Sequence, residues 1–584
     1  MAKVYFLGVT IPHSTAALLC DGEILGVMTE DRFNRRKNCV SYPRESIEFL
    51  LKEFNVRKEE IAGVVLSFQN GVHYGFQISS GGTKSFYDRL IQFTYRLPLL
   101  NIAYKVLYKI YKKWINRKWS VKQAGMIASH LGIPTEKIIS YPHFMNHAAS
   151  VVYALDKQDD RVLVLTNDGA GDEYCASVTV YENGEFNVLA KVHNDNSLAG
   201  FYGIVTLLMG MKFNEHEFKV MGLAPYTNPN QQGVYDCLEI FRGLFSLDGI
   251  RFKSKIDAKH YIPYLAPKIR RMRFDWIAYA AQAFIEEFLC AWATNVVKET
   301  GIRDICCAGG IFMNVKANKA LSELDCVDSL HVMPSAADES TAIGAAYLGY
   351  VDHCKAQGKT PDTKPLKDLY LGVYVTDDDV AAYITANNLE EDFFIHTPED
   401  PEAEVAKLLA DGKVVARFAG RMEFGQRALG NRSLLANPSI PGVVKNINDR
   451  IKSRDFWMPF AGSILDEDAD EYIVNPKNLN AYYMMHSFDS TPLGQDKIPA
   501  ALHPYDKTIR PQLVKKEMNP RYHHLLSRFK ELTGIGAVLN TSLNLHGEPV
   551  VCSIADAFHT IRNSDLDYLQ LESYIFERKE KALE

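Results

Sequence analysis

Two histidines four residues apart, His143 and His147, are the first side chains whose spacing suggests chemistry. On a helix, positions i and i+4 share one face, so both imidazoles can reach a single metal ion. The pair alone also fits packing or helix capping, so a third ligand from elsewhere is required. A carboxylate is the best candidate, because two histidines and a carboxylate with open positions suit non-haem Fe(II), although Zn or Mn could also bind.

Two loops offer such a carboxylate. Asp168 lies in the segment NDGAGDE, directly after the apolar run RVLVLT, and its small glycines would let the backbone approach a phosphate. Asp338 precedes the small-residue segment STAIGAA, where a helix start would suit metal or phosphate chemistry. The alternatives are an ordinary acidic hairpin turn for Asp168 and a helix N-cap for Asp338.

A glycine pair, Gly309-Gly310, separates the apolar run ICCA from the segment IFMNVKANKAL. A strand, a Gly-Gly turn and a helix in succession bring backbone N–H groups close to a ligand. With the N-terminal strand hairpin and the two acidic loops, this order is that of the nucleotide-binding fold shared by actin, heat-shock chaperones and sugar kinases (ASKHA). We therefore expect Gly309, Gly310, Asn314 and Asp168 to contact a nucleotide.

The C-terminal part is rich in arginine placed among glycine and aromatic residues. The segment GRMEFGQRALGNRSLLANP at 420–438 carries three arginines, and NDRIKSRDFWMPFAGSIL adds Arg450, Lys452 and Arg454. Arg510 and the motif NTSLN, which begins at Asn540, follow. The planar guanidinium matches phosphate oxygens, so this composition indicates a polyanion pocket better than solvated surface charge.

The elements that must position these residues alternate between hairpins and helices, which predicts an α/β architecture with mixed sheets. Apolar runs and Asp-Gly or Asn-Gly turns predict strands, and 47–54 and 274–300 have helical periodicity. A polar segment with two prolines at 353–368 is interpreted as a linker. The expected domains are 1–360 and 361–584. The expected strands are 4–9, 16–19, 23–28, 61–67, 161–166, 176–181, 186–192 and 305–308.

The totals exclude some functional classes. A chain of 584 residues needs more than one core, and a net charge of −6 gives no general attraction for nucleic acid. The ten scattered cysteines, the absence of a secretory signal pattern and the absence of a long apolar run suit a cytoplasmic protein without a membrane span.

One segment, 84–122, has ten basic residues and a single acid. It is interpreted as an amphipathic insertion, with peripheral contact to a lipid or anionic acceptor as the alternative.

Eight motifs in order along the chain resemble the carbamoyltransferases of antibiotic and nodulation-factor biosynthesis, the nodulation protein U and cephalosporin carbamoyltransferase type. The pair GQRALGNRS and NTSLN is the most specific. One departure is that Ile11-Pro12 precedes His13 where more polar residues are expected. The motifs are HSTAA, HFMNHAAS, NDGAGDE, KVMGLAPY, AGGIFMN, GQRALGNRS, KSRDFWMPFA and NTSLN.

The resemblance implies two stages. A C-terminal YrdC-like domain would convert ATP and carbamoyl phosphate into carbamoyl adenylate, with Mg²⁺ as helper. An N-terminal duplicated ASKHA domain would then transfer the carbamoyl group to a hydroxyl. By the resemblance, His13 is the catalytic base, His143, His147 and Asp338 bind Fe²⁺ beside Asp168, and Lys37 lies near the nucleotide. The residues expected to hold carbamoyl phosphate and ATP are Arg427, Arg432, Arg450, Lys452, Arg510 and Asn540.

The acceptor is expected to be a hydroxyl of a small molecule or saccharide, and a homodimer is possible. One alternative is a tRNA threonylcarbamoyladenosine-type transferase, which would need a basic face for RNA. A second is an ASKHA-fold sugar kinase, which would leave the C-terminal half without a function and would release ADP instead of AMP.

Overall fold

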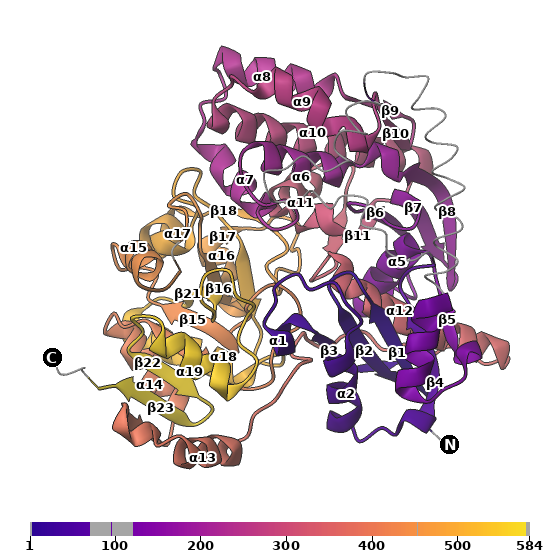
Figure 1. Cartoon of the computed structure of the whole chain (residues 1–584). Helices are drawn as coiled ribbons and strands as arrows, with labels where there is room; N and C mark the ends of the chain where they lie inside the picture. The colour runs from indigo at the N-terminus through magenta and orange to yellow at the C-terminus, as the bar shows by residue number, and fades with distance from the viewer. Residues whose placement is uncertain (1–2, 70–94, 96–120, 453, 580–584) are drawn as a thin grey trace. The chain divides into compact units, whose positions relative to one another are not determined.

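The computed structural model describes residues 3–69, 95, 121–452 and 454–579, and it divides the chain into two compact units (Figure 1). The first unit comprises Met1–Leu25 and Val40–Pro365, and the second comprises Gly26–Cys39 and Leu366–Glu584. The division after Pro365 lies five residues beyond the expected one, and the N-terminal part is interrupted. The reason is that 26–39 bonds to the second unit: the Val27 N–H donates to the Leu371 carbonyl (3.1 Å) and Arg35 donates to the carbonyls of Pro549 and Val550 (2.8 Å each).

The first unit contains two five-stranded sheets with the same topology. In each sheet the first strand pairs antiparallel with the second and parallel with the fourth, and the fourth pairs parallel with the fifth. The unit therefore contains one arrangement twice. The first sheet has the order β3 (Glu23–Thr29), β2 (Thr15–Cys20), β1 (Tyr5–Thr10), β4 (Ile61–Leu66), β5 (Ile138–Ser140), and the second β12 (Ser329–Val332), β11 (Asp304–Ala308), β6 (Val162–Asn167), β7 (Tyr174–Glu182), β8 (Glu185–His193).

The predicted hairpins are confirmed, because both tight turns have the left-handed backbone that a two-residue hairpin requires. Asp21 and Gly22 have φ of 48° and 87°, and Asn183 and Gly184 have φ of 53° and 76°. Such turns match the twist of the flanking strands.

Two helices, α5 (His143–Ala154) and α12 (Thr341–Ala356), pack against each other through glycine. A Cβ added to Gly344 would lie 1.9 Å from the carbonyl oxygen of Asn146 in α5, and one added to Gly8 would lie 1.9 Å from that of Ala342 in α12. Backbone can approach backbone this closely only where no side chain intervenes. Because α12 extends to Ala356, the first four residues of the expected linker 353–368 are helical.

Most of the remaining helices of the first unit, α6 to α11, lie together at one end of it (Figure 1). The helix predicted at 274–300 is confirmed as α10 (Phe274–Thr300). None of the helices in the described ranges is long and apolar enough to cross a membrane. Apart from residues 95, 121 and 122, the basic insertion predicted at 84–122 lies outside the described residues. The other helices include α2 (Arg44–Glu53), α6 (Leu198–Leu208), α7 (Glu217–Leu223), α8 (Gln232–Arg242), α9 (Tyr261–Ile269) and α11 (Val315–Ser322), and residues 121–131 are also helical.

The second unit is built on an eight-stranded mixed sheet, which confirms the predicted α/β class. Its order is β13 (Phe393–His396), β23 (Tyr574–Arg578), β22 (Tyr568–Leu571), β14 (Val415–Phe418), β15 (Arg432–Ala436), β21 (Ala537–Ser542), β16 (Ala461–Leu465), β20 (Pro511–Val514). Its helices include α1 (Asp31–Asn34), α13 (Asp377–Ala386), α14 (Pro401–Ala410), α15 (Val443–Ile447), α17 (Pro492–Lys497), α18 (Pro520–Thr533) and α19 (Ile554–Arg562).

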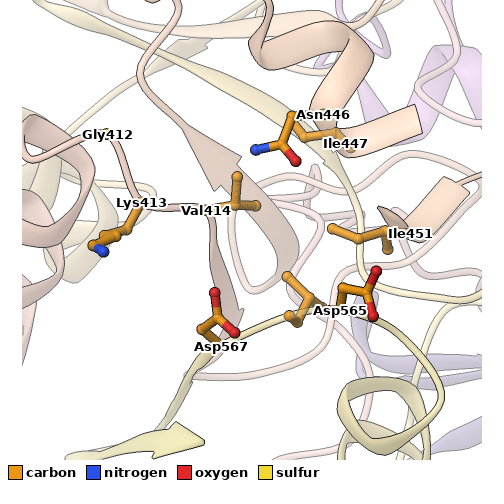
Figure 2. A pocket seen from close by; sticks show the side chains of 9 residues that line it. Gly412, Lys413, Val414, Asn446, Ile447, Ile451, Asp565 and Asp567 are labelled. Atoms are coloured by element: carbon orange, nitrogen blue, oxygen red, sulfur yellow. The ribbon is translucent and has the colours of Figure 1, made fainter. Parts of the chain in front are cut away.

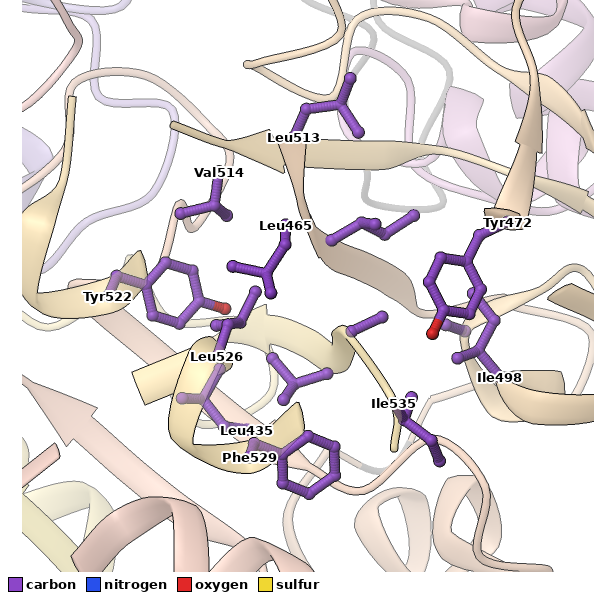
Figure 3. Close-up of a cluster of buried hydrophobic side chains, with 14 of the residues drawn as sticks. Leu435, Leu465, Tyr472, Ile498, Leu513, Val514, Tyr522, Leu526, Phe529 and Ile535 are labelled. Atoms are coloured by element: carbon purple, nitrogen blue, oxygen red, sulfur yellow. The ribbon is translucent and has the colours of Figure 1, made fainter. Parts of the chain in front are cut away.

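Apolar side chains are buried on both faces of this sheet. Successive residues of β15 alternate between two clusters, with Leu435 in one and Leu434 in the other. Figure 3 shows the first cluster, in which Leu435 and Leu465 lie with Phe529 of α18 and Tyr472. Burial on both faces explains why the central strands β14, β15 and β16 lack the alternation between buried and exposed residues of a surface sheet, which the edge strand β13 retains.

Candidate active site

The two histidines of α5 and the two predicted acidic residues meet at one point in the first unit. One ligand atom from each of His143, His147, Asp168 and Asp338 lies within 4.8 Å of the others. The Nε2 atoms of the two histidines are 3.1 Å apart, and an oxygen of Asp338 lies 3.2 Å from one and 3.5 Å from the other. Asp168 Oδ2 lies 3.5 Å from His143 Nε2. We call these four residues the acid–histidine centre.

Neighbouring elements fix two members of this centre, His143 and Asp168. The Asp172 carboxylate accepts a hydrogen bond from the His143 backbone N–H (2.9 Å) at the start of α5, and Phe68 stacks on the His143 ring at 4.1 Å between centroids. Gly310 N–H donates to Asp168 Oδ1 (2.8 Å), which leaves Oδ2 toward His143. The glycine turn predicted to contact a nucleotide therefore orients a carboxylate of the centre.

The charges of the centre act strongly on one another. Burial by itself would lower the pKa of His143, but Asp338 and Asp168 outweigh it and raise that pKa to about 10. Burial would likewise raise the pKa of Asp338, but the imidazoles, His143 above all, hold it well below its usual range. The arrangement therefore needs positive charge, either protons or a cation.

The residues present fit a metal ion. Two Nε2 atoms 3.1 Å apart match the spacing of about 3 Å between adjacent ligands of an octahedral ion bound at ~2.1 Å. The Asp338 Oδ1 atom is buried and accepts no hydrogen bond from the described residues. Two imidazoles with two carboxylates are a donor set for a divalent transition metal.

His13, the predicted base, lies in the turn between β1 and β2. Its Nδ1 atom is 3.5 Å from Oε2 of Glu339, a residue that is 2% exposed. His13 itself has φ of 56°, a left-handed conformation that is rare outside glycine, asparagine and aspartate. Asn314, by contrast, uses its side chain inside the protein: it caps α11 and exchanges hydrogen bonds with Gln282 (2.9 and 3.0 Å). Its predicted contact with a nucleotide stays a prediction.

In the second unit, cationic side chains are gathered with other cations. Burial and the charges of Arg427 and Arg454 lower the pKa of Arg510 well below its usual range. Burial and Arg427 lower that of Arg454 to about 10, and burial with Arg454 and Lys37 lowers that of Lys452. The Lys452 ammonium also donates to the backbone carbonyls and side-chain oxygens of Ser542 and Asn544, so it holds the NTSLN segment as well as adding positive charge. We call Lys37, Arg427, Lys452, Arg454 and Arg510 the cationic cluster. Lys37, expected near the nucleotide of the N-terminal domain, thus groups with the second unit.

The Arg427 loop is held from several sides. Glu423, which is buried, accepts hydrogen bonds from the N–H groups of Leu429 (2.7 Å) and Arg432 (3.1 Å). Asn540 donates to the Ala428 carbonyl (3.1 Å). Asn540, predicted to bind the anion, is thus committed to supporting the loop that carries Arg427.

Two further predicted anion-binding residues differ in what the structure shows. The fully buried Arg432 donates to the carbonyls of Gly420 (2.9 Å), Asn431 (3.0 Å) and Val373 (3.2 Å) and lies 3.5 Å above the Phe418 ring. These three bonds engage both terminal nitrogens of the guanidinium, whereas its Nε is buried without a hydrogen-bond partner among the described residues. The expected anion contact of Arg432 stays a prediction. Arg450 lies on a π-helical turn at Asn448–Lys452, and its side chain is outside the described part.

A cavity of about 210 Å³ in the second unit is separate from both groups. Figure 2 shows it open beside Asp565 and Asp567, with Ile447 and Ile451 on its wall. None of the predicted site residues lines it.

Comparison with known proteins identifies the family. Residues 6–347 match the carbamoyltransferase N-terminus, and residues 406–578 match the carbamoyltransferase C-terminus. The chain belongs to the carbamoyltransferase family.

Two relatives span nearly the whole chain, and a third spans about half of it. Nodulation protein NolNO of Sinorhizobium fredii is 28% identical over 98% of this chain and 80% of its own length. An uncharacterized protein of Synechocystis is 28% identical over 98% and 96%. Nodulation protein U of Bradyrhizobium diazoefficiens is 31% identical over 48% and 47%. A solved structure, component A of the Acidaminococcus fermentans (R)-2-hydroxyglutaryl-CoA dehydratase, is similar over 60% of this chain and 97% of its own, with 15% identity and a TM-score of 0.31.

Two residues of this carbamoyltransferase escaped the sequence-based predictions, Glu339 and Glu423. Arg454 was counted with the basic residues of the predicted polyanion pocket, but it was not among the residues assigned to carbamoyl phosphate and ATP, and its effect on the pKa of Arg510 is seen only in the structure. Glu339 follows Asp338 directly, and only the three-dimensional turn shows that it faces His13. Glu423 precedes the GQRALGNRS motif, where a buried carboxylate gives no signal in the sequence.

Proposed function

We propose that this protein is an ATP-dependent O-carbamoyltransferase. The second unit, as a YrdC-like domain, makes carbamoyl adenylate from ATP and carbamoyl phosphate, and the first unit, as a duplicated ASKHA-type domain, transfers the carbamoyl group to a hydroxyl. The observation that carries the proposal is that one carbamoyltransferase chain contains both groups. The acid–histidine centre has two carboxylates that favour a bound cation, and the cationic cluster has like charges that favour a bound anion.

The cationic cluster supports the activation stage. Both charged neighbours that shift the pKa of Arg510 are arginines, so a polyanion would relieve their repulsion as well as gain charge-assisted hydrogen bonds. ATP and carbamoyl phosphate supply such an anion, with Mg²⁺ to neutralise part of it. The balanced reaction consumes one water, releases pyrophosphate and inorganic phosphate, and leaves the carbamoyl group on the α-phosphate of AMP.

The acid–histidine centre would hold Fe²⁺ or a related divalent ion through His143, His147 and Asp338, with Asp168 beside them. When bound, such an ion supplies Lewis-acid stabilisation of the negative charge that develops on a phosphate leaving group. The protein's own contribution is to fix the ligands, through Gly310, Asp172 and Phe68, before substrate arrives.

The transfer step assigns proton removal to His13. The acceptor oxygen attacks the carbamoyl carbon, the bond from that carbon to the phosphate oxygen breaks, and AMP leaves with the electron pair. A neutral imidazole takes the hydroxyl proton, and such positioned base catalysis is typically worth ~10²–10⁴-fold. The acceptor is proposed to be a small molecule or saccharide, a class in keeping with relatives named nodulation proteins.

The test is an acceptor screen with ATP and ¹⁴C-labelled carbamoyl phosphate, scored by mass increase of each alcohol or saccharide. Formation of AMP with pyrophosphate is expected, dependent on carbamoyl phosphate. Release of ADP would favour the sugar kinase alternative, and a requirement for threonine, bicarbonate and tRNA would favour the threonylcarbamoyladenosine alternative.

A further inference from the structure

Glu339 is a buried carboxylate whose position demands an explanation. It lies on the short turn Asp338–Ser340 that leads into α12, and it is 2% exposed. Burying a carboxylate without partners costs several kcal/mol, so such a group is normally paired. Its Oε1 accepts a hydrogen bond from the hydroxyl of Ser335. Its Oε2 points at the Nδ1 atom of His13, 3.5 Å away.

The His13 side of this pair is also fixed. His13 and Ser14 both have positive φ, 56° and 36°, a conformation that persists only where surrounding contacts enforce it. The hydroxyl of Thr15 donates to the His13 carbonyl (2.8 Å), and the Ser14 N–H donates to the carbonyl of Ile11 (3.0 Å). The Ser41 N–H donates to the Ser14 hydroxyl (2.7 Å). These bonds fix the backbone at His13, and the imidazole that it carries lies beside Glu339.

We propose that Glu339 is a positioning residue for the transfer step: it accepts the Nδ1–H of His13, so that the ring proton lies on Nδ1 and Nε2 carries the lone pair that takes the proton of the acceptor hydroxyl. The inference rests on the proposed function, since it concerns the base of that reaction. The distance of 3.5 Å is longer than a hydrogen bond, and such contacts commonly tighten when substrate is bound. The second ring nitrogen of a catalytic histidine is commonly held in this way by a carboxylate that stays ionised.

Because Glu339 follows Asp338 directly, the same turn places one carboxylate at the acid–histidine centre and another beside His13. Asp338 reaches His143 and His147, whereas Glu339 reaches His13. One turn of chain thus sets the acid–histidine centre and the base at a fixed separation. The proton balance is complete: the acceptor O–H loses its proton to His13 Nε2, the carbamoyl–oxygen bond to the acceptor forms, and AMP departs from the same carbon.

The experiment uses the full-length, metal-loaded protein and its Glu339→Gln variant, which keeps the size of the side chain. Activation is measured as carbamoyl-phosphate-dependent exchange of labelled pyrophosphate into ATP, and transfer as carbamoylation of glycerol in large excess. We expect exchange and bound metal within twofold of wild type, an unchanged KM for glycerol, and a kcat for transfer at least ~10²-fold lower. Glu136→Gln, the same change on the surface, should alter neither reaction.

A second pair of measurements separates positioning from support of the fold. In a His13→Asn background, Glu339→Gln should lower transfer by no more than twofold further, because the group it orients is already gone. Ser335→Ala, which removes the partner of Oε1 but keeps the carboxylate, should lower transfer several-fold with exchange intact. Normal transfer in Glu339→Gln, a multiplicative loss in the His13→Asn background, or parallel loss of bound metal would each overturn the inference. Exchange without any transfer by wild type would instead contradict the transfer half of the proposed function.

Discussion

The acid–histidine centre and the cationic cluster solve opposite electrostatic problems. In the first, groups of opposite charge face one another, so the pKa of His143 rises and that of Asp338 falls. In the second, like charges are held together, so the pKa values of Lys452, Arg454 and Arg510 all fall. The charges of the centre can be balanced by protons or a metal ion, whereas the like charges of the cluster would be stabilised by a bound anion. Clustered groups with strongly shifted pKa values are more common at binding and catalytic sites than elsewhere.

The largest effect is expected for Asp338→Asn. Removing a carboxylate ligand should release the metal ion and lower transfer by more than ~10³-fold, since metal charge stabilisation is worth several kcal/mol and each 1.36 kcal/mol is tenfold. Metal analysis of the purified protein and glycerol carbamoylation measure the two losses. Pyrophosphate exchange should stay within twofold of wild type. If Asp338→Asn kept its metal and its transfer activity, the centre would not be a metal site needed for transfer, and its proposed role would no longer differ from that of the cluster.

The centre and the cluster should also differ in how the chelated protein responds to pH. With the metal removed, the pKa of His143 lies at about 10, above its ordinary 6.5. Protonated His143 therefore contributes fully to the free energy of unfolding below pH 6.5, and this contribution is lost as pH rises toward 10. The loss in free energy of unfolding is on the order of 5 kcal/mol by the linkage of 1.36 kcal/mol per pKa unit.

Urea unfolding from pH 6.5 to 10, with and without metal, measures this dependence. His143→Gln in chelated protein is the matched control, in which the slope should flatten. The metal-loaded protein should lack the decline, because a metal replaces the proton on the imidazole. Equal slopes with and without metal would contradict the assignment of these ligands.

Arg510→Gln probes the cluster. Losing one charge-assisted contact to a bound phosphate should lower pyrophosphate exchange by ~10²-fold, since such a contact contributes about 1.5–3 kcal/mol. Bound metal should be unchanged. The variant should also lose most of the increase in Tm that pyrophosphate gives wild type, because a ligand stabilises only the state that binds it. Arg528→Gln, on the surface of α18, serves as the control for removing an arginine.

Many residues of the two regions could be predicted from the sequence, because their spacing and type indicate their roles. The i, i+4 histidines on α5 and the glycine turn before α11 follow from periodicity, and the two hairpins follow from their turn residues. The sequence could not say which polar groups face inward to the protein. Asn314 and Asn540 satisfy internal hydrogen bonds, and Glu339 faces a residue more than three hundred positions away. Those pairings arise from packing that no local pattern encodes.

Arginines of the second unit also show that the sequence does not tell which charged groups bond inside the protein. Their substitution gives the smallest of the expected effects, a change in the free energy of unfolding. Arg432 and Arg454 stand in similar surroundings of glycine and aromatic residues, yet Arg432 donates to three carbonyls whereas Arg454 faces other cations. Arg432→Gln should therefore lower the free energy of unfolding by about 2 kcal/mol, because it leaves buried carbonyls without donors. Arg454→Gln should leave it unchanged or raise it by up to about 1 kcal/mol, since a like-charge repulsion is removed. Urea unfolding in a phosphate-free buffer separates the two. If both variants lost equal stability, Arg454 would be part of the fold and the cluster would shrink to Lys37, Arg427, Lys452 and Arg510.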